Sequence, residues 1–374
     1  MVGAVATPVV KGDPSGPAAQ VSYALPEYIN PVMPAPSPSY WLWPANNTNF
    51  VVESLEDFGM MDDPDNPLEI YRDGGGSCNI ANRTIWFFCD TLGYDNDTFK
   101  AMTDKSLSVA QNFSEPSLLS DATSNSLYSY GWQPAIPYTQ DEWPMRNSPS
   151  KRFTMWTYTN CIQTSDSQAI QFFALSKSNS IYSSTYCANM LTVTRNQQVM
   201  FPSTTYSYGS FASMVVQGVA FLYALDGTYS GNRDVHVARV ATWAITDITK
   251  YQYYDASTKT WSYTQPQPTA RRQSAAVLSN WIPYSTGSMF YSEYHNAYLL
   301  VYFNGWADST FRVSYAPSPT LYALPQGPRG YDYGGVAHPQ YYQNDGPSGK
   351  SILLHYSYQD TSYTYPRAAK LTFV

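Results

Sequence analysis

The feature that most constrains this fold is a long succession of short apolar and aromatic segments, separated by polar connections rich in proline and glycine. Helical periodicity is almost absent beyond residue 65, so the segments predict strands rather than helices. They fall into five groups, at 71–91, 152–195, 214–254, 288–315 and 333–374. Within the third group, 214–225 is predicted as a single strand. Five groups predict an all-β fold, a five-bladed β-propeller, with a two-sheet sandwich as the alternative.

The same pattern divides the chain into an arm and one domain. Residues 1–65 contain a Pro-rich stretch and are expected to form an extended N-terminal arm packed on the domain. Residues 66–374 are expected to form the propeller, with an insertion at about 99–150 that borders the binding pocket. The C-terminal strand 370–374 is expected to pair with an N-terminal strand, because that pairing removes an open sheet edge.

The amino-acid composition limits the kinds of molecule that this protein can be expected to bind. Only 13% of the 374 residues are charged, whereas 16% are aromatic, and the chain contains 34 tyrosines. Tyrosine suits strands, and at strand ends it suits surfaces that bind sugars or flat hydrophobic molecules. A net charge of -7 and the lack of a Lys/Arg cluster argue against nucleic acid. No apolar run approaches the roughly 18 residues that span a bilayer. The expected partner is therefore a small hydrophobic substrate or a polysaccharide.

Cysteines and sequons indicate the compartment. The four cysteines are Cys78, Cys89, Cys161 and Cys187. They allow three disulfide connectivities, of which Cys78–Cys89 with Cys161–Cys187 would staple two hairpins. Sequons that could accept a glycan occur at Asn46, Asn82, Asn96 and Asn112. Residues 1–12 lack the basic start and apolar core of a signal peptide. We therefore expect a secreted protein whose signal has been removed.

A predicted hairpin carries an acidic residue at each end. Asp73 precedes Gly74-Gly75-Gly76, and Asp90 follows the strand-forming run 85–88. Three glycines leave room for a sharp bend or for close approach of a ligand. The two carboxylates are expected at the same end of neighbouring strands. So placed, they could serve acid–base chemistry, bind a metal, or simply cap turns.

These residues carry a resemblance to a known family. Arg72 to Ser77 (RDGGGS) and Ile85 to Thr91 (IWFFCDT) resemble the opening motif of the DUF4185-type propellers, and the similarity extends loosely over residues 66–374. Looser similarities lie at 138–142 and 297–319. Some members of that family are endo-D-arabinanases that hydrolyse with paired aspartates. The resemblance implies that role for Asp73 and Asp90, with Glu142 as a further candidate. The arginine before the first aspartate and the three glycines after it depart from the family pattern.

The same fold also resembles a fungal group that includes hetero-Diels–Alderases of tropolonic sesquiterpene biosynthesis. These enzymes join a quinone methide to a humulene-type olefin. Such a cycloaddition needs a dry, shape-selective cavity and a donor that polarises the quinone methide oxygen. The low charge and the many aromatic residues suit that task. No motif of this subgroup is present from which residue roles could be transferred.

A few other side chains are candidates for the site. His338 opens the last strand group and is a candidate donor or proton shuttle. Arg72 is either a partner of a carboxylate or a cation that faces the ligand, whereas Trp156 and Trp306 are candidates for substrate contact. No grouping of His, Asp and Glu has zinc-site spacing, so no metal or cofactor is expected.

Together these observations predict a fungal pericyclase, a hetero-Diels–Alderase of secondary-metabolite biosynthesis. The alternative is a secreted glycoside hydrolase of the endo-arabinanase type that uses Asp73 and Asp90. A second alternative is a non-catalytic propeller whose aromatic residues stack on sugars.

Overall fold

The computed structural model is almost entirely β. The chain divides into two compact units, Met1–Leu42 and Trp43–Val374, and every described residue belongs to the second. Within the described residues the helical elements are two single turns of 3-10 helix, η2 (Thr242–Ala244) and η3 (Ile248–Lys250). The all-β prediction is therefore confirmed. The structure describes residues 50–80, 83–110, 114–121, 135–142, 154–157, 159–175, 180–187, 192–196, 198–226, 232–267, 276–283, 286–303, 310–314, 320–323, 327–329, 331–343 and 346–374.

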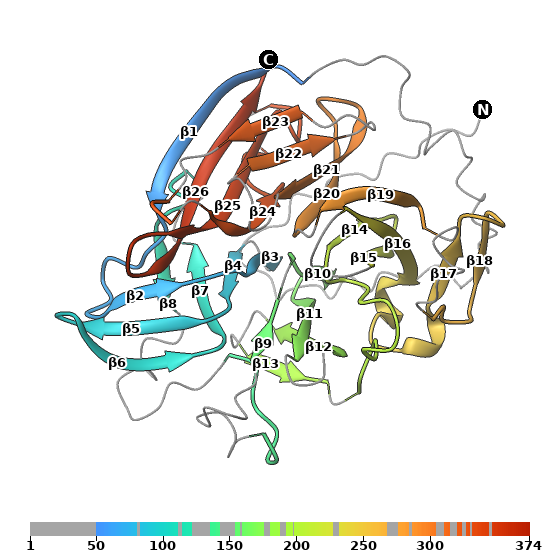
Figure 1. Ribbon diagram of the computed structural model, residues 1–374, viewed down its shortest axis with the longest axis horizontal. Coiled ribbons are helices and arrows are strands. Elements are labelled where there is room, and N and C mark those ends of the chain that lie inside the picture. Colours follow the sequence, from blue (N-terminus) through green and yellow to red (C-terminus); the bar gives the residue numbers. More distant parts are fainter. Residues whose placement is uncertain are drawn as a thin grey trace, which may run out of the picture. The chain divides into compact units, whose positions relative to one another are not determined.

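The first strands alternate between two sheets (Figure 1). Sheet I has the order β3-β4-β7-β8, and a smaller side sheet has the order β2-β5-β6. β3 and β4 pair as the predicted hairpin, whose strands end at Ile80 opposite Arg83. The chain leaves the side sheet after β2 and returns to it after β4. Sheet I contains β3 (Gly76–Ile80), β4 (Arg83–Phe88), β7 (Ser106–Ala110) and β8 (Leu119–Asp121), and the side sheet contains β2 (Glu69–Arg72), β5 (Thr91–Asp95) and β6 (Thr98–Thr103).

Sheets II and IV are antiparallel meanders of strands consecutive along the chain. In sheet II the short strand β9 also pairs with β11. Sheet II contains β9 (Met155–Trp156), β10 (Ile162–Ser165), β11 (Gln168–Leu175), β12 (Ser180–Cys187) and β13 (Thr192–Arg195). Sheet IV contains β20 (Gly287–Ser292), β21 (Ala297–Phe303), β22 (Thr310–Ser314) and β23 (Thr320–Ala323).

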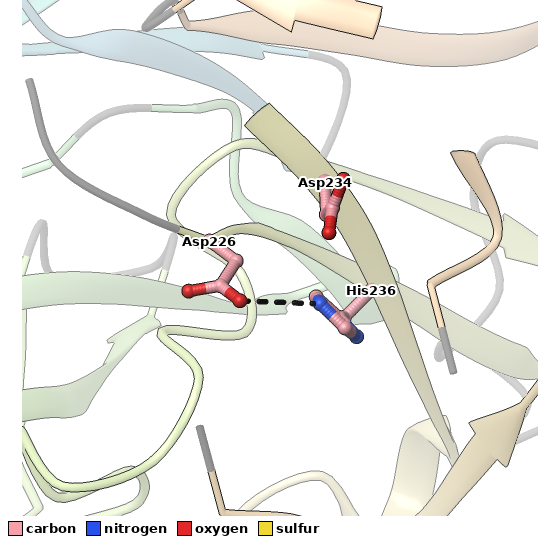
Figure 2. A group of neighbouring side chains, drawn as sticks. All are labelled: Asp226, Asp234 and His236. Carbon is pink, nitrogen blue, oxygen red and sulfur yellow. Dashed lines mark ion pairs between the residues drawn. The ribbon is translucent and has the colours of Figure 1, made fainter. Parts of the chain in front are cut away.

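Sheet III lies between them in sequence. Its first two strands occupy the segment predicted as one, because Gln217 and Gly218 turn the chain with φ of 50° and 76°. β15 and β16 form a hairpin. Asp226 directly follows β15, and Asp234 and His236 lie on β16 at the same end of the hairpin (Figure 2). Sheet III contains β14 (Ala212–Val216), β15 (Val219–Leu225), β16 (Asn232–Ala241), β17 (Gln252–Asp255), β18 (Thr260–Ser262) and β19 (Leu278–Pro283).

Sheet V joins the two ends of the domain. It contains β24 (Tyr333–His338), β25 (Ser351–Gln359), β26 (Thr364–Phe373) and the N-terminal strand β1 (Val52–Met60), in the order β1-β26-β25-β24. β1, blue in Figure 1, runs antiparallel to the red β26. The predicted pairing of the C-terminal strand with an N-terminal strand is therefore confirmed, and β26 is not an open edge.

Two predicted boundaries look different in the structure. β1 lies inside the range 1–65 that was expected to be an arm, so this part of the range is a strand of sheet V. Residues 1–49, with most of the Pro-rich stretch, lie outside the described residues. The range 99–150, expected to be an insertion, supplies most of β6 and all of β7 and β8. Its first part is therefore integral to the sheets.

One edge strand from each of sheets I to V takes part in a closed ring of contacts. β3 contacts β10, β10 contacts β14, and β14 contacts β20; β20 then contacts β24, and β24 contacts β3. Consecutive meanders whose edge strands meet around a centre are the arrangement of a β-propeller. The ring matters for function because it places residues from distant parts of the chain side by side.

Apolar side chains fill the spaces between successive sheets. Ile170 and Phe172 of sheet II pack with Leu222 of sheet III, and Val301 of sheet IV packs with Leu354 of sheet V. Another cluster joins sheet V back to sheet I through Trp86, Phe88, Leu353 and Ala368. Each large apolar side chain buried in this way contributes about 1.5–3 kcal/mol to folding. No helix among the described residues is long and apolar enough to cross a membrane.

Candidate functional site

The structure places Asp73 and Asp90 directly beside each other. Both lie where the chain crosses between the side sheet and sheet I, Asp73 between β2 and β3 and Asp90 between β4 and β5. The Asp90 N–H donates to Asp73 Oδ1 at 2.9 Å, and the Asp73 N–H donates to the Asp90 carbonyl at 3.0 Å. The Cys89 N–H donates to the Asp73 carbonyl at 2.8 Å. These bonds fix the two partly exposed aspartates as one unit.

The glycines after Asp73 make this crossing possible. Gly74 and Gly75 have φ of +52° and +105°, which favour glycine. A Cβ on Gly75 would lie 2.0 Å from the Phe87 carbonyl oxygen, and one on Gly76 would lie 2.6 Å from the Thr159 carbonyl oxygen. The room that the glycines leave is thus occupied by neighbouring backbone, and the run serves a bend rather than a ligand.

The carboxyl of Asp73 keeps its proton to a higher pH than an ordinary aspartate does. Burial, followed by the negative charge of Asp90, raises the pKa of Asp73 to about 7. The Tyr333 hydroxyl donates to Asp73 Oδ2 at 2.6 Å and opposes the shift. Because two neighbouring carboxylates resist simultaneous ionisation, the pair gives up its last proton only near neutral pH. A carboxyl that holds its proton at that pH can act as a general acid.

A buried lysine lies next to the pair, and nothing in the sequence pattern signals it. Lys105 is fully buried, and its Nζ donates to Thr157 Oγ1 at 2.8 Å and lies 3.9 Å from Cys89 Sγ. Burial lowers the pKa of Lys105, against the opposing influence of Cys89 and the nearby aspartates. Burial also raises the pKa of the Cys89 thiol to about 11, so this thiol is not an activated nucleophile.

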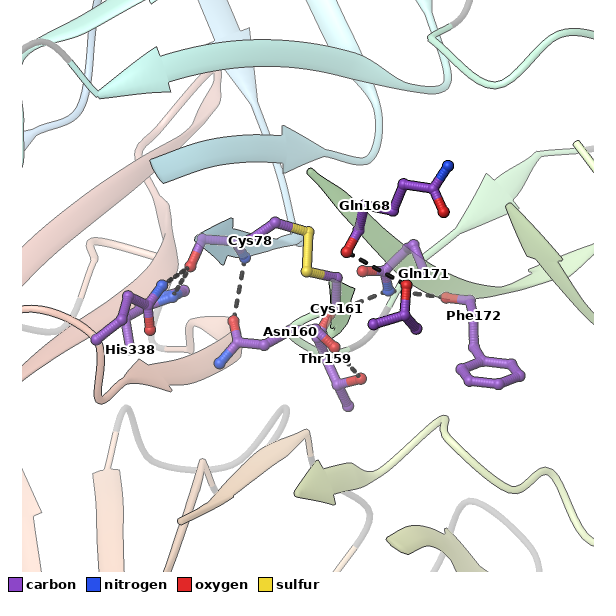
Figure 3. The surroundings of a disulfide bond; sticks show 11 residues. Cys78, Thr159, Asn160, Cys161, Gln168, Gln171, Phe172 and His338 are labelled. Carbon is purple, nitrogen blue, oxygen red and sulfur yellow. Dashed lines mark hydrogen bonds between the residues drawn. A yellow bond between two sulfur atoms is a disulfide. The ribbon is translucent and has the colours of Figure 1, made fainter. Parts of the chain in front are cut away.

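The disulfide connects two sheets rather than two strands of one hairpin. Cys78 on β3 is bonded to Cys161 immediately before β10 (Figure 3). This bond excludes the connectivity Cys78–Cys89 with Cys161–Cys187, one of the three that the sequence left open. Cys89 is a buried free thiol, and the side chain of Cys187 lies outside the described part of the chain. The bond follows from the fold, because β3 lies against β10 across 83 residues of sequence.

A cavity of about 370 Å³ opens beside the disulfide. The aspartate pair does not line it, although Ser77 on its wall lies only four residues after Asp73. The described residues that line it include no charged side chain. They come from sheets I to IV, from the segment before β10 and from the segment after β24: Ser77, Cys78, Asn79, Thr159, Asn160, Cys161, Gln163, Ser213, Met214, Val215, Gly287, Ser288, Met289, Phe290, Tyr291, Tyr298, Pro339, Gln340 and Gln343.

His338 reaches this cavity only through Ser77. The imidazole is fully buried, and its Nδ1 lies 2.6 Å from Ser77 Oγ, which also accepts from the Gln340 amide (Figure 3). The ring packs against Trp86, with centroids 4.2 Å apart. Burial, followed by His355, lowers the pKa of His338 well below its ordinary value. A neutral imidazole behind a cavity hydroxyl can polarise that hydroxyl, but it cannot itself contact a ligand there.

Glu142 is bound in an ion pair. Arg195 on β13 donates to both of its carboxylate oxygens, with Nη2 at 2.8 Å from Oε1, and the Thr139 N–H donates to Oε2 at 2.9 Å. Burial acts to raise the pKa of Glu142, but the bonds from Arg195 and Thr139 outweigh it and lower the pKa. An ionised, bidentate carboxylate of this kind fixes the segment 135–142 to sheet II and is poorly suited to donate a proton.

The remaining predicted site residues differ in their exposure to solvent. Arg72 is 2% exposed, and its guanidinium lies over the Phe88 ring at 5.0 Å, so the side chain belongs to the interior beside the pair. Trp156 on β9 is 37% exposed and accessible to a ligand. Asn96 is exposed in the turn between β5 and β6. Four other predicted positions lie outside the described residues: Trp306, Asn46, Asn82 and Asn112.

Comparison with known proteins finds likeness in fold. No protein-family model matches the chain, and no curated protein sequence matches it. A protein from Bacteroides ovatus ATCC 8483 described as a "putative hydrolase" superposes with a TM-score of 0.57 at 14% identity, over 80% of this chain and 85% of that one. The GH43 β-1,3-galactosidase BT0265 gives 0.48 at 10% identity, over 85% and 60%. The family 117 glycoside hydrolase Zg3597 of Zobellia galactanivorans gives 0.47 at 8%, over 86% and 91%. At these identities the likeness to the first protein shows a shared fold.

Proposed function

We propose that this chain is a glycoside hydrolase built on a five-bladed β-propeller, with Asp73 and Asp90 as its catalytic carboxyls. The observation that carries the proposal is the Asp73 carboxyl, whose pKa is raised to about 7 by burial and by the adjacent Asp90. Two partly exposed carboxyls, one protonated and one charged near neutral pH, are the groups that glycoside hydrolysis requires.

The blade count is part of the proposal. We take sheets I to V as the five blades, because each contains at least four strands and one edge strand of each belongs to the closed ring. The side sheet is then an addition to the first blade. Its position explains why the aspartates come together: two of the three crossings between the side sheet and sheet I, β2 to β3 and β4 to β5, carry one of them each.

The reaction follows from the two protonation states. Asp73 donates its proton to the oxygen of the leaving sugar as the glycosidic carbon–oxygen bond breaks. Asp90 either attacks the anomeric carbon or takes a proton from the water that does so. Tyr333 orients the Asp73 carboxyl through its 2.6 Å bond, and buried Lys105 favours the charged form of both aspartates. The family resemblance directs the substrate search to furanose polymers such as arabinans.

The test compares four proteins on a panel of polysaccharides and alkyl furanosides, whose leaving groups need a proton. The wild type is expected to release sugar, and Asp73→Asn and Asp90→Asn are expected to lose about 10²–10⁴-fold in rate. Asp65→Asn, which changes an exposed carboxylate in a turn, is the matched control and should retain full activity. Hydrolysis that survives in both aspartate variants would contradict the proposal. Binding of sugar without hydrolysis would instead support the non-catalytic sugar-binding propeller.

A pericyclase of the hetero-Diels–Alderase type is the second candidate. The observation that favours it is the cavity of about 370 Å³, which has methionine and aromatic side chains and no charged residue among those that line it. Asn160 and Ser288 lie on its wall as polar groups next to a Phe290 and Met289 surface. A cycloaddition needs such shape selection and polarisation but no carboxylate pair.

The two candidates respond to different variants. A pericyclase should raise the rate and stereoselectivity of adduct formation between a tropolone-derived quinone methide and humulene. Ser213→Trp, which fills the cavity from β14, should abolish that effect, whereas Asp73→Asn should not. Adducts identical to those formed in buffer alone would exclude the pericyclase.

We also infer passage through the secretory pathway. The Cys78–Cys161 disulfide and the exposed sequon at Asn96 support an oxidising compartment. Expression in a eukaryotic secretory host should give a protein that loses mass on endoglycosidase treatment, and Asn96→Gln should remove part of that loss. An unglycosylated, reduced protein would contradict this inference.

A further inference from the structure

The register of β15 and β16 gathers two carboxylates and an imidazole on one face of sheet III. Ala224 lies opposite His236 and Leu225 opposite Val235, and the Asp226 N–H donates to the Asp234 carbonyl at 2.9 Å. Side chains two residues apart on a strand share a face, as do residues opposite one another on neighbouring strands. Asp226, Asp234 and His236 therefore converge at the end of this hairpin (Figure 2).

The distances within this cluster suit a small cation. Each residue offers one ligand atom, and these atoms all lie within 4.8 Å of one another. His236 Nε2 and Asp226 Oδ2 are 3.7 Å apart. Zinc–ligand bonds of about 2.0–2.2 Å in tetrahedral geometry place two ligand atoms roughly 3.4 Å apart. Small side-chain rotations are therefore enough to bring the three donors onto one ion.

His236 supplies an independent reason to look for a ligand here. The side chain is 1% exposed, and its ring stacks on Tyr206 at 3.8 Å with an interplanar angle of 16°, which fixes the plane of the imidazole. Its Nε2 has no hydrogen-bond partner and faces the Asp226 carboxylate. A buried polar nitrogen without a partner is destabilising, and a coordinated metal ion would remove that cost.

We propose that Asp226, Asp234 and His236 bind a divalent transition-metal ion, Zn²⁺ in the first place. Nitrogen and carboxylate oxygen ligands are those that zinc takes in proteins, and three protein ligands leave a fourth position for water. The Asp226 side chain is 29% exposed, so ion and water have access from solvent. The bound ion connects the end of β15 to β16. This site is separate from the Asp73/Asp90 pair, which lies outside sheet III.

The test measures zinc affinity directly. Protein stripped with EDTA is titrated with ZnCl₂ by calorimetry, and Co²⁺ serves as the spectroscopic probe of coordination. We expect one equivalent of Zn²⁺ to bind, and Asp226→Asn, Asp234→Asn and His236→Gln each to weaken binding at least about tenfold. His295→Gln and Asp65→Asn are matched controls outside the cluster and should bind as the wild type does.

Two outcomes would overturn the proposal. One is the absence of saturable zinc binding by the wild type, which would leave the cluster as a His–Asp ion pair. The other is binding that is equally strong in all three variants, which would place the ion elsewhere. If His236→Gln does not fold, the more exposed Asp226→Asn decides, and a Co²⁺ absorption spectrum without a nitrogen ligand counts against the proposal.

Discussion

Replacement of Asp73 by asparagine should stabilise the folded protein at alkaline pH and leave its stability nearly unchanged in acid. Burial and the charge of Asp90 raise the pKa of Asp73 from 3.8 to about 7. A carboxyl with a raised folded pKa binds more protons in the folded state, so the wild type loses stability as the pH rises from about 4 to about 7. Roughly three units at 1.36 kcal/mol each give about 4 kcal/mol. Because Asp73 retains partial exposure, screening reduces our expectation to about 2 kcal/mol.

Urea unfolding of the wild type and Asp73→Asn at about pH 4 and about pH 8 measures this difference. The asparagine side chain keeps one oxygen for the Asp90 N–H, and its amide can donate to the Tyr333 oxygen, so no buried partner is abandoned. Asp65→Asn is the control and should show no pH-dependent change. Equal differences at both pH values, or a destabilised variant at alkaline pH, would refute the reasoning about Asp73.

Three further predictions test other parts of the account. Tyr333→Phe removes a hydrogen bond to the charged Asp73 carboxylate that is worth about 1.5–3 kcal/mol. The pKa of Asp73, and with it the alkaline limb of the pH profile of kcat/KM, should therefore rise by roughly one to two units. An unchanged alkaline limb would count against the assignment of Asp73. Gly75→Ala should prevent folding, because its Cβ meets the Phe87 carbonyl. Gly218→Ala, also at positive φ but in open space, should lower the free energy of unfolding by only about 1 kcal/mol, and equal melting temperatures for the two variants would contradict this. Cys78→Ser with Cys161→Ser should lower the free energy of unfolding by about 2–5 kcal/mol in denaturant titrations, because the bond closes 83 residues; a loss below about 1 kcal/mol would show that it contributes little.

The strand groups could be predicted because strand patterns are local. Runs of β-branched and aromatic residues marked each sheet, and the pairing of the terminal strands followed from the need to cover an edge. The segment 214–225 was misjudged because apolar residues continue through its turn. Only Gln217-Gly218, with positive φ at both residues, separates β14 from β15. A two-residue turn with glycine second is the signal that could have found it.

The site was harder to predict because its parts meet only through the ring of sheets. The aspartate pair was visible in one short segment, but Lys105 lies between two other strands and gains its role through burial. The disulfide could not be assigned from the sequence, because Cys78 and Cys161 lie 83 residues apart and come together only where β3 contacts β10. Asp226 and His236 belong to one hairpin, and the register of that hairpin is the signal that places them together.

The central claim, that Asp73 is the proton donor and Asp90 its charged partner, is tested most directly by leaving-group dependence. A leaving group that is already a weak base needs no proton, whereas a poor one depends on the acid. Asp73→Asn should therefore hydrolyse dinitrophenyl furanosides at nearly the wild-type rate and lose about 10²–10⁴-fold on alkyl furanosides. Asp90→Asn should lose comparably on both. Equal losses for Asp73→Asn on the two substrate classes, or no loss on either, would contradict the account.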